Sequence, residues 1–133
     1  MQNEDGKGKG KNLESWKAEF SERLLSFAAQ VIKLTSKLDA SYSAQHISKQ
    51  LIRSATSMGA NYEEACNAES RNDFVHKMQI VLKESQETLY WLKLLKTAEL
   101  VKNSAADIHR ILDEATQINK ITAKSVMTAR QSS

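Results

Sequence analysis

The absence of proline most constrains what this chain of 133 residues can fold into. Proline breaks helices because it lacks a backbone N–H group and its ring clashes with the preceding turn. Three of the four glycines, Gly6, Gly8 and Gly10, lie near the N-terminus, and strong helix formers dominate the remainder. Beyond its N-terminal segment the sequence therefore predicts long helices, and its length suits one domain.

Hydrophobic residues recur at helical spacing in the first stretch, from about residue 14 to 38. They follow each other at intervals of three and four, which predicts one apolar helix face: Leu13, Trp16, Phe20, Leu24, Phe27, Val31, Leu34 and Leu38. Leu25, Ala28 and Ile32 widen this face, and we expect them to lie toward a neighbouring helix.

Three further helices are predicted from the same spacing. The second begins after Ser43 and ends near residue 69, and the third spans about 73–100 after a cap at Asn72 or Asp73. The fourth follows a cap at Ser104 or Asn103 and frays from Thr128. Short connections make consecutive helices antiparallel neighbours. The predicted fold is therefore all-α, an antiparallel up-down-up-down four-helix bundle over residues 13–130.

The N-terminal segment 1–12 differs from the rest of the chain. It is polar and glycine-rich, with alternating Gly and Lys residues, and we expect a disordered basic tail. A native flexible arm and a remnant of expression both fit this pattern.

The middle of the second predicted helix has unusually small side chains. Gly59 within a helix costs roughly 1 kcal/mol relative to alanine, and close approach of another helix is the usual reason for such a residue. We therefore expect tight contact there, with Ser54, Ser57 and Asn61 bonding across it.

The third predicted helix is apolar on more than one side. Its main face is accompanied by a second apolar set, Ile80, Leu82, Trp91 and Leu94. A helix that is apolar on two sides is buried on two sides. The second set predicts an interface between copies of the chain.

Composition and motifs exclude several classes of protein. The lone Cys66 cannot form an intramolecular disulfide, and no apolar run is long enough to span a membrane, so we expect a cytoplasmic protein. A di-iron bundle needs Glu-x-x-His pairs on two helices, but only Asp73 and His76 have the matching spacing. With no catalytic triad or phosphate-binding loop either, we expect a non-enzymatic protein without metal or other cofactor.

The segment from Gln50 to Ala65 reads QLIRSATSMGANYEEA. It resembles the QL-x-RSA-x-S-[IM]-x-AN-x-x-EA signature of a bacterial family of four-helix-bundle proteins, first noticed in intervening sequences of 23S ribosomal RNA genes. The resemblance covers about residues 20–115. It continues through the motif positions Ser70, Asp73, Phe74, Lys77, Lys83, Glu84, Glu87, Tyr90, Trp91, Leu92, Leu94 and Leu95.

This resemblance implies an antiparallel four-helix bundle that assembles into a closed homopentameric ring. The family also includes accessory proteins of diversity-generating retroelements, whose basic rings bind nucleic acid and a reverse transcriptase. The net charge of +3 departs from that strongly basic character. Structural roles are implied for the motif positions Arg53, Ser54, Ser57, Asn61, Glu64, Asp73, Phe74, Lys77, Lys83, Glu84, Glu87, Tyr90 and Trp91.

Charged residues of the motif are expected to pair between the second and third helices. Arg53, Lys77 and Lys83 can pair with Glu64, Glu84 and Glu87 and so fix the register of the two helices. Removal of one partner would leave an unpaired buried charge, so we expect Glu64→Ala to lower thermal stability or break up the oligomer.

Two hypotheses of function follow. The first is RNA or DNA binding through exposed cations of the third helix and the chain end, Lys93, Lys96, Lys120, Lys124 and Arg130. The second is a protein-interaction scaffold whose partner is a reverse transcriptase. Tyr90 and Trp91 fit either a base-stacking platform or core and interface packing, and their leucine-rich surroundings favour packing.

Overall fold

A computed structural model describes residues 12–131 as four long α-helices with no β-strand among them. The helices are α2 (Leu13–Thr35), α3 (Tyr42–Cys66), α4 (Arg71–Thr97) and α5 (Ala105–Gln131), and a single 3₁₀ turn, η1 (Lys102–Ser104), precedes α5. The prediction of an all-α fold with four helices is confirmed. Within the described residues, no helix combines the length and the apolar character needed to cross a membrane.

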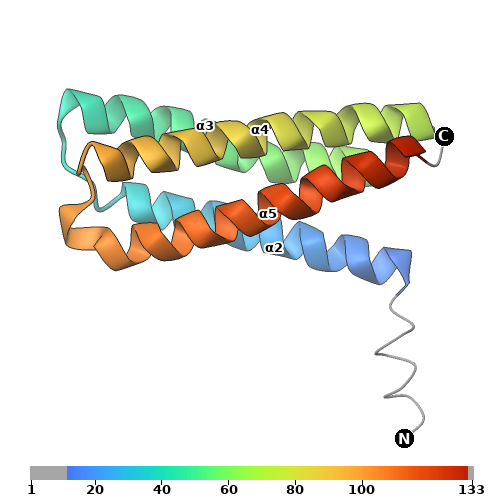
Figure 1. Cartoon of the computed structure of the whole chain (residues 1–133), viewed down its shortest axis with the longest axis horizontal. Coiled ribbons are helices and arrows are strands. Elements are labelled where there is room, and N and C mark those ends of the chain that lie inside the picture. The colour runs from blue at the N-terminus through green and yellow to red at the C-terminus, as the bar shows by residue number, and fades with distance from the viewer. Residues whose placement is uncertain (1–11, 132–133) are drawn as a thin grey trace, which may run out of the picture.

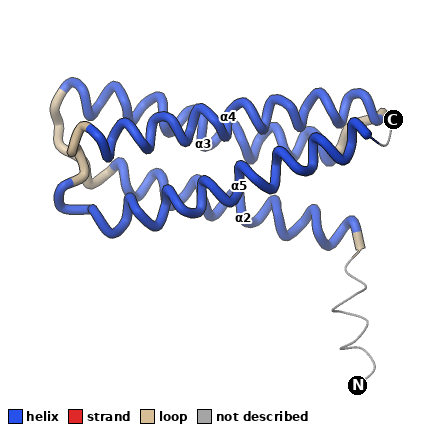
Figure 2. The backbone as a smooth tube through the Cα atoms, in the orientation of Figure 1, coloured by secondary structure: helices blue, strands red, loops and turns tan. Residues whose placement is uncertain are grey.

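The four helices lie lengthwise beside one another, and loops occupy only the two ends of the molecule (Figures 1 and 2). The α2–α3 and α4–α5 connections lie at one end in Figure 1, and the α3–α4 connection lies at the other. The most extensive contacts join α4 to its two neighbours, α3 and α5. This arrangement is consistent with a four-helix bundle. Most of the predicted tail lies outside the described residues; Asn12, its last residue, belongs to the fold.

Three helices begin after a side-chain cap. Asn12 Oδ1 accepts the Ser15 N–H group at 2.8 Å, Ser41 Oγ accepts the N–H group of Ala44, and Ser70 Oγ accepts the N–H group of Asp73. The predicted caps at Ser43 and Asn72 or Asp73 were therefore wrong by two or three residues. In both cases a serine that precedes the predicted cap takes this role, which leaves Ser43, Asn72 and Asp73 inside the helices.

The first three helices end about three residues earlier than predicted. Leu38 and Leu100 lie beyond the ends of α2 and α4, yet both pack against the core, so the apolar pattern continues where the helix does not. The opposite error occurs at the chain end. Fraying from Thr128 was predicted, but α5 continues to Gln131, because Ala129 is buried and its carbonyl oxygen accepts a hydrogen bond from Arg71.

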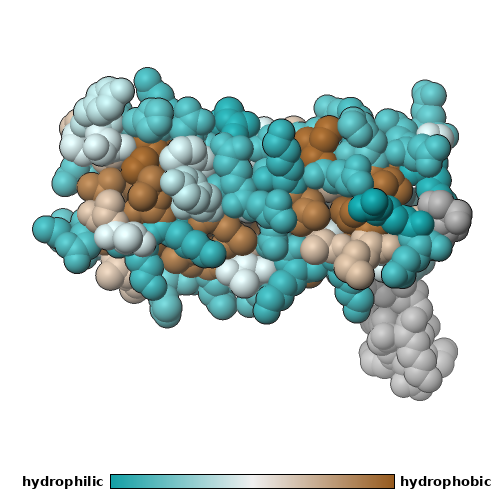
Figure 3. Space-filling model, turned by 45° about the horizontal axis from the view of Figure 1, so that its top comes forward, coloured by the Kyte–Doolittle hydropathy of each residue, from teal (hydrophilic) through white to brown (hydrophobic). Residues whose placement is uncertain are grey.

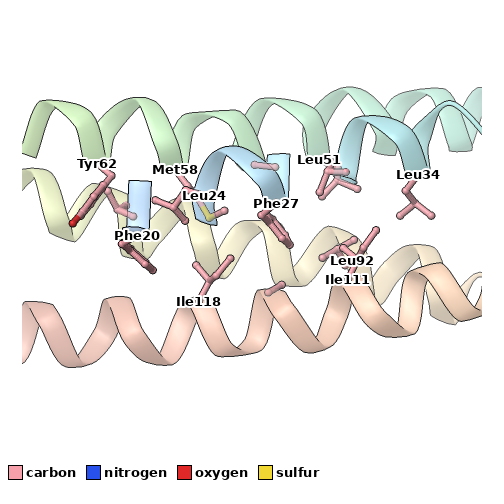
Figure 4. Packing of buried hydrophobic residues seen from close by; sticks show 14 of the residues in the cluster. Phe20, Leu24, Phe27, Leu34, Leu51, Met58, Tyr62, Leu92, Ile111 and Ile118 are labelled. Atoms are coloured by element: carbon pink, nitrogen blue, oxygen red, sulfur yellow. The ribbon is translucent and has the colours of Figure 1, made fainter. Parts of the chain in front are cut away.

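The core lies between the helices and follows their predicted apolar faces. Figure 4 shows its side chains pointing from all four helices into the common interior. Fully buried members with large side chains include Leu24, Phe27, Leu34, Leu51, Met58, Tyr62, Met78, Leu92, Leu95, Ile111 and Ile118. The first two residues of the predicted apolar face of α2 are not buried, so this part of the prediction is wrong: Leu13 is 64% exposed and Trp16 is 36% exposed. In Figure 1 the first turns of α2 diverge from the last turns of α5, so this end of α2 has less to pack against.

Among the small and polar residues in the middle of α3, Ser54 forms a hydrogen bond to α4 as predicted, whereas Asn61 and Gly59 do not make the predicted contacts with another helix. Ser54 is buried, and its hydroxyl oxygen lies 2.8 Å from that of Thr88 on α4. Asn61, in contrast, donates to the Ser57 carbonyl oxygen within its own helix. A Cβ atom at Gly59 would lie 3.8 Å from the Leu24 Cβ atom, which is ordinary contact. The predicted tight approach at Gly59 is therefore wrong.

The second apolar set of α4 is more buried than Leu25 and Ile32 on α2. Leu82, Trp91 and Leu94 of the second apolar set on α4 are half-buried and pack against the core, because α4 lies against both α3 and α5. On α2, by contrast, Leu25 is 65% exposed and Ile32 is 48% exposed. Ile80 is half-buried as well, and the use of this second set as an interface between copies stays a prediction. The expectation that Leu25 and Ile32 lie against a neighbouring helix is wrong. On the face shown in Figure 3, hydrophobic side chains form separate patches among hydrophilic ones.

Candidate nucleic-acid interface

An open groove of about 900 Å³ runs between the C-terminal half of α4 and the first half of α5. Lys93 and Lys96 line it from α4, and His109, Arg110 and Asp113 line it from α5. Leu112 forms part of its floor, and its side chain also packs against the core. The groove therefore combines three permanent cations with one carboxylate on exposed side chains.

Helical spacing explains why these residues share a groove. Lys93, Lys96 and Thr97 stand three and four residues apart, so they lie on one face of α4. The same spacing relates Ala106, His109, Arg110 and Asp113 on α5. The adjoining end of the groove adds Lys102, which shares a smaller pocket with Lys96 and His109.

The cations of the groove are largely free of counter-ions. Neither Lys93 nor Lys96 forms an ion pair with another described residue. Arg110 lies 3.3 Å from the Asp107 carboxylate, but Asp107 also accepts a 2.8 Å hydrogen bond from Lys37, which holds the pKa of the Asp107 carboxyl below its usual range. Within the described residues, Arg110 therefore forms an ion pair only with Asp107, a carboxylate that also pairs with Lys37. Such a groove can bind an anion.

The structure divides the five predicted nucleic-acid-binding residues. Lys93 and Lys96 line the groove, whereas Lys120, Lys124 and Arg130 are exposed farther along α5 and do not. Lys120 lies ten residues beyond Arg110, about 15 Å along the helix axis. Sequence reasoning missed Arg110 and His109, since only the relative register of α4 and α5 places them opposite Lys93 and Lys96.

Charged motif residues form a network between α3 and α4. Arg53 pairs with Glu87 and lies 3.3 Å from Glu84, and the Trp91 indole Nε1–H donates to Glu87 at 3.0 Å. The hydrogen bonds from Arg53 and then from Trp91 lower the pKa of the Glu87 carboxyl. Lys83, which is exposed, adds a weaker electrostatic effect in the same direction.

The ion pair between Glu64 and Lys77 lies at the surface. The Lys77 Nζ atom is 2.6 Å from a Glu64 oxygen, but the Glu64 side chain is 58% exposed. The expectation of a buried charge at Glu64 is therefore wrong, because Glu64 lies on the solvent-facing side of the last turn of α3. Nearby, Asp73 lies in the first turn of α4, and Phe74 is half-buried against the core.

The two motif aromatics differ in their burial. Trp91 is half-buried and packs against the core, whereas the neighbouring Tyr90 is 58% exposed. Packing of Tyr90 in the core of the bundle, one of the expected alternatives, is therefore wrong.

The described residues offer little for metal or thiol chemistry. Between residues 12 and 131, no three His, Cys, Asp or Glu side chains are grouped so that they could hold a metal ion. Cys66 is half-buried, and burial raises the pKa of its thiol. Burial likewise raises the pKa of the neighbouring Tyr62 hydroxyl, so neither group is activated as a nucleophile.

Comparison with known proteins gives a family and a similar structure. The family model of the 23S rRNA-intervening sequence proteins matches residues 11–124. A crystal structure of a protein with unknown function from the S23 ribosomal protein family of Bacteroides thetaiotaomicron is 36% identical in sequence, with a TM-score of 0.74. The alignment covers 84% of this chain and 97% of that one. No curated protein matches the sequence.

Proposed function

The chain belongs to the family of 23S rRNA-intervening sequence proteins, and we propose that it is a non-enzymatic, oligomeric protein that binds RNA or other nucleic acid along the groove between α4 and α5. The observation that carries the proposal is the convergence of Lys93, Lys96 and Arg110 on one open groove. Their charges face solvent, and the two lysines have no described counter-ion.

Phosphate is the anion that best suits this groove. Lysine and arginine side chains make most of the contacts that proteins form with nucleic-acid backbones, and each contact releases condensed counter-ions. The groove is open along its length, which suits a continuous strand. Three cations per copy are few, so strong binding requires several copies to act on one nucleic acid.

We further propose that the chain forms an antiparallel up-down-up-down bundle whose copies assemble as a homopentameric ring, as the family resemblance implies. The exposed Leu25 and Ile32 line a mainly apolar groove between α2 and α3 together with Ala28, Gly59 and Ala60. Small side chains there allow a second copy to approach closely. Burial of this face would leave the groove between α4 and α5 free for nucleic acid.

A protein-interaction scaffold is the second candidate function. The exposed apolar face of α2 could equally receive a protein partner, such as a reverse transcriptase, in place of a second copy. A pull-down that recovers RNA but no protein partner would argue against it.

Binding of fluorescently labelled structured RNA, measured at several salt concentrations, tests the nucleic-acid proposal. Affinity for a duplex region should fall by about 0.9 log units per phosphate contact for each log unit of salt. Binding that does not change with salt, or no binding at low salt, would overturn the proposal.

A further inference from the structure

Four aromatic side chains form a continuous row across α3 and α4. The rings of Tyr42 and His46 are stacked with centroids 6.4 Å apart, and His46 meets Trp91 edge to face at 6.3 Å. Trp91 in turn meets Tyr90 edge to face at 5.1 Å. We call these four residues the aromatic row.

The aromatic row is exposed at both ends and anchored in its middle. Tyr42 is 86% exposed and Tyr90 is 58% exposed, whereas Trp91 packs against the core. The hydrogen bond from Trp91 to Glu87, whose carboxylate also pairs with Arg53, fixes the orientation of the indole. Exposed rings held on a rigid support lose little conformational entropy when they bind a flat ligand.

The aromatic row lies next to the basic groove. Tyr90 precedes Lys93 by three residues on α4, and both side chains are exposed, so they are neighbours one turn apart on the helix surface. On α3, the exposed Lys49 stands in the same relation to His46. The face therefore presents exposed rings flanked by cations, with the groove between α4 and α5 beginning at Lys93.

We propose that the aromatic row stacks unpaired bases of a nucleic-acid strand whose phosphates lie in the groove between α4 and α5. This inference rests on the proposed function and assigns its ligand class: single-stranded rather than duplex nucleic acid. Bases stack on aromatic side chains through their π-faces, which in a duplex are covered by neighbouring base pairs. Charge alone would favour a duplex, because it carries the denser phosphate charge.

Neither the rings nor the lysines read the sugar, so unpaired RNA and unpaired DNA share the chemistry that this face recognises. An exposed aromatic face could also bind a protein. The neighbouring cations favour nucleic acid, since they complement phosphate and not an apolar protein surface.

The test compares binding of unstructured oligo(U), unstructured oligo(dT) and an RNA duplex of equal length to the full chain and to its Tyr90→Leu and Tyr90→Phe variants. Tyr90→Leu keeps an apolar side chain without a ring, and we expect it to weaken binding of both single strands about five- to a hundredfold. Binding of the duplex should stay unchanged. Tyr90→Phe, the matched control, keeps the ring and should bind as the wild type does.

Fluorescence gives a second readout. Trp16 and Trp91 are the two tryptophans of the chain, so in a Trp16→Phe background the emission comes from Trp91 alone. Stacking near Trp91 should quench this emission when oligo(U) is added, whereas inorganic polyphosphate should leave it unchanged. Quenching by polyphosphate to the same extent would contradict stacking.

The outcomes separate this inference from the proposed function. If duplex and single strands bind equally and Tyr90→Leu changes neither, stacking is wrong while nucleic-acid binding stands. If no nucleic acid binds, both fail. A Tyr90→Leu protein with an altered molar mass would show that the aromatic row is an interface between copies and would overturn the inference. Comparable weakening of oligo(U) and oligo(dT) binding by Tyr90→Leu would support it, because the rings contact the bases and not the sugar.

Discussion

The hydroxyl oxygens of Ser54 and Thr88 lie 2.8 Å apart across the buried contact between α3 and α4. Both side chains are fully buried and lie among the aliphatic residues of their helix faces. Each hydroxyl also lies within hydrogen-bond distance of a carbonyl oxygen of its own helix, Leu51 for Ser54 and Glu84 for Thr88. The bond between the two hydroxyls is an additional contact that forms in one register and is lost when one helix slides along the other. The pair therefore specifies how α3 and α4 align.

Thr88→Val should destabilise the protein by about 1 kcal/mol, because the buried Ser54 hydroxyl loses a partner while the side-chain volume is kept. Urea unfolding at fixed protein concentration measures the change. The double variant Ser54→Ala/Thr88→Val should recover most of the loss, because both polar groups are then absent. A double variant that loses as much as the sum of the two single variants would contradict a direct bond.

Glu87→Gln should lower stability at pH 7 by up to about 1 kcal/mol, the range for partly exposed ion pairs, because it weakens the bonds from Arg53 and Trp91. The folded state lowers the pKa of Glu87 below that of the unfolded chain. The stabilisation is therefore fully present above about pH 4.3, the ordinary glutamate value, and is lost as the pH falls through the folded-state pKa.

Urea unfolding at several pH values from 7 down to 3 should show the difference in unfolding free energy between wild type and Glu87→Gln shrinking toward zero. A difference that stays constant or grows in acid would show that Glu87 is not held as a carboxylate.

Glu64→Ala should shift the melting temperature by no more than about 3 °C, since the Glu64 carboxylate is exposed to solvent and its partner Lys77 is only half-buried. Thermal unfolding followed by circular dichroism measures this. Leu51→Ala is the comparison, because deleting a fully buried leucine costs about 2–5 kcal/mol. A Glu64→Ala protein as unstable as Leu51→Ala would mean that assembly buries the pair.

Leu25→Glu should break up the oligomer while leaving the helical content unchanged, because the side chain is exposed in the single chain and would be covered only by a second copy. Light scattering gives the molar mass: the wild type should have about five times the 14.9 kDa of one chain. Met127→Glu adds the same charge at an exposed apolar residue of α5 and should remain assembled. Dissociation of Met127→Glu but not of Leu25→Glu would place the interface elsewhere.

The helices and most of the core were predictable from spacing alone, because residues such as Leu24, Phe27 and Val31 repeat at three and four along one face. Helix ends were not. Ser41 and Ser43 are equally good caps in isolation, and Leu38 and Leu100 show that apolar residues in a connection can pack like helical ones.

The candidate site was only half predictable. Lys93 and Lys96 stand out as a pair on one exposed face, but Arg110 joins them through a contact between α4 and α5 that no local pattern contains. The exposure of the apolar residues on α2 was not predicted, for the same reason. Whether an apolar side chain is covered depends on how closely the two flanking helices pack against its own: α3 and α5 pack extensively against α4 but less against α2, which leaves Leu25 and Ile32 exposed.

The most direct measurement of the central claim is the salt dependence of oligo(U) binding for two charge-matched variants, Lys93→Gln/Lys96→Gln and Lys120→Gln/Lys124→Gln. On a single strand each phosphate contact contributes about 0.7 to the slope of log affinity against log salt. If the groove between α4 and α5 holds the backbone, the first variant should bind more weakly with a slope smaller by about 1.4, and the second should keep the wild-type slope. Equal slopes for the two variants would contradict the account.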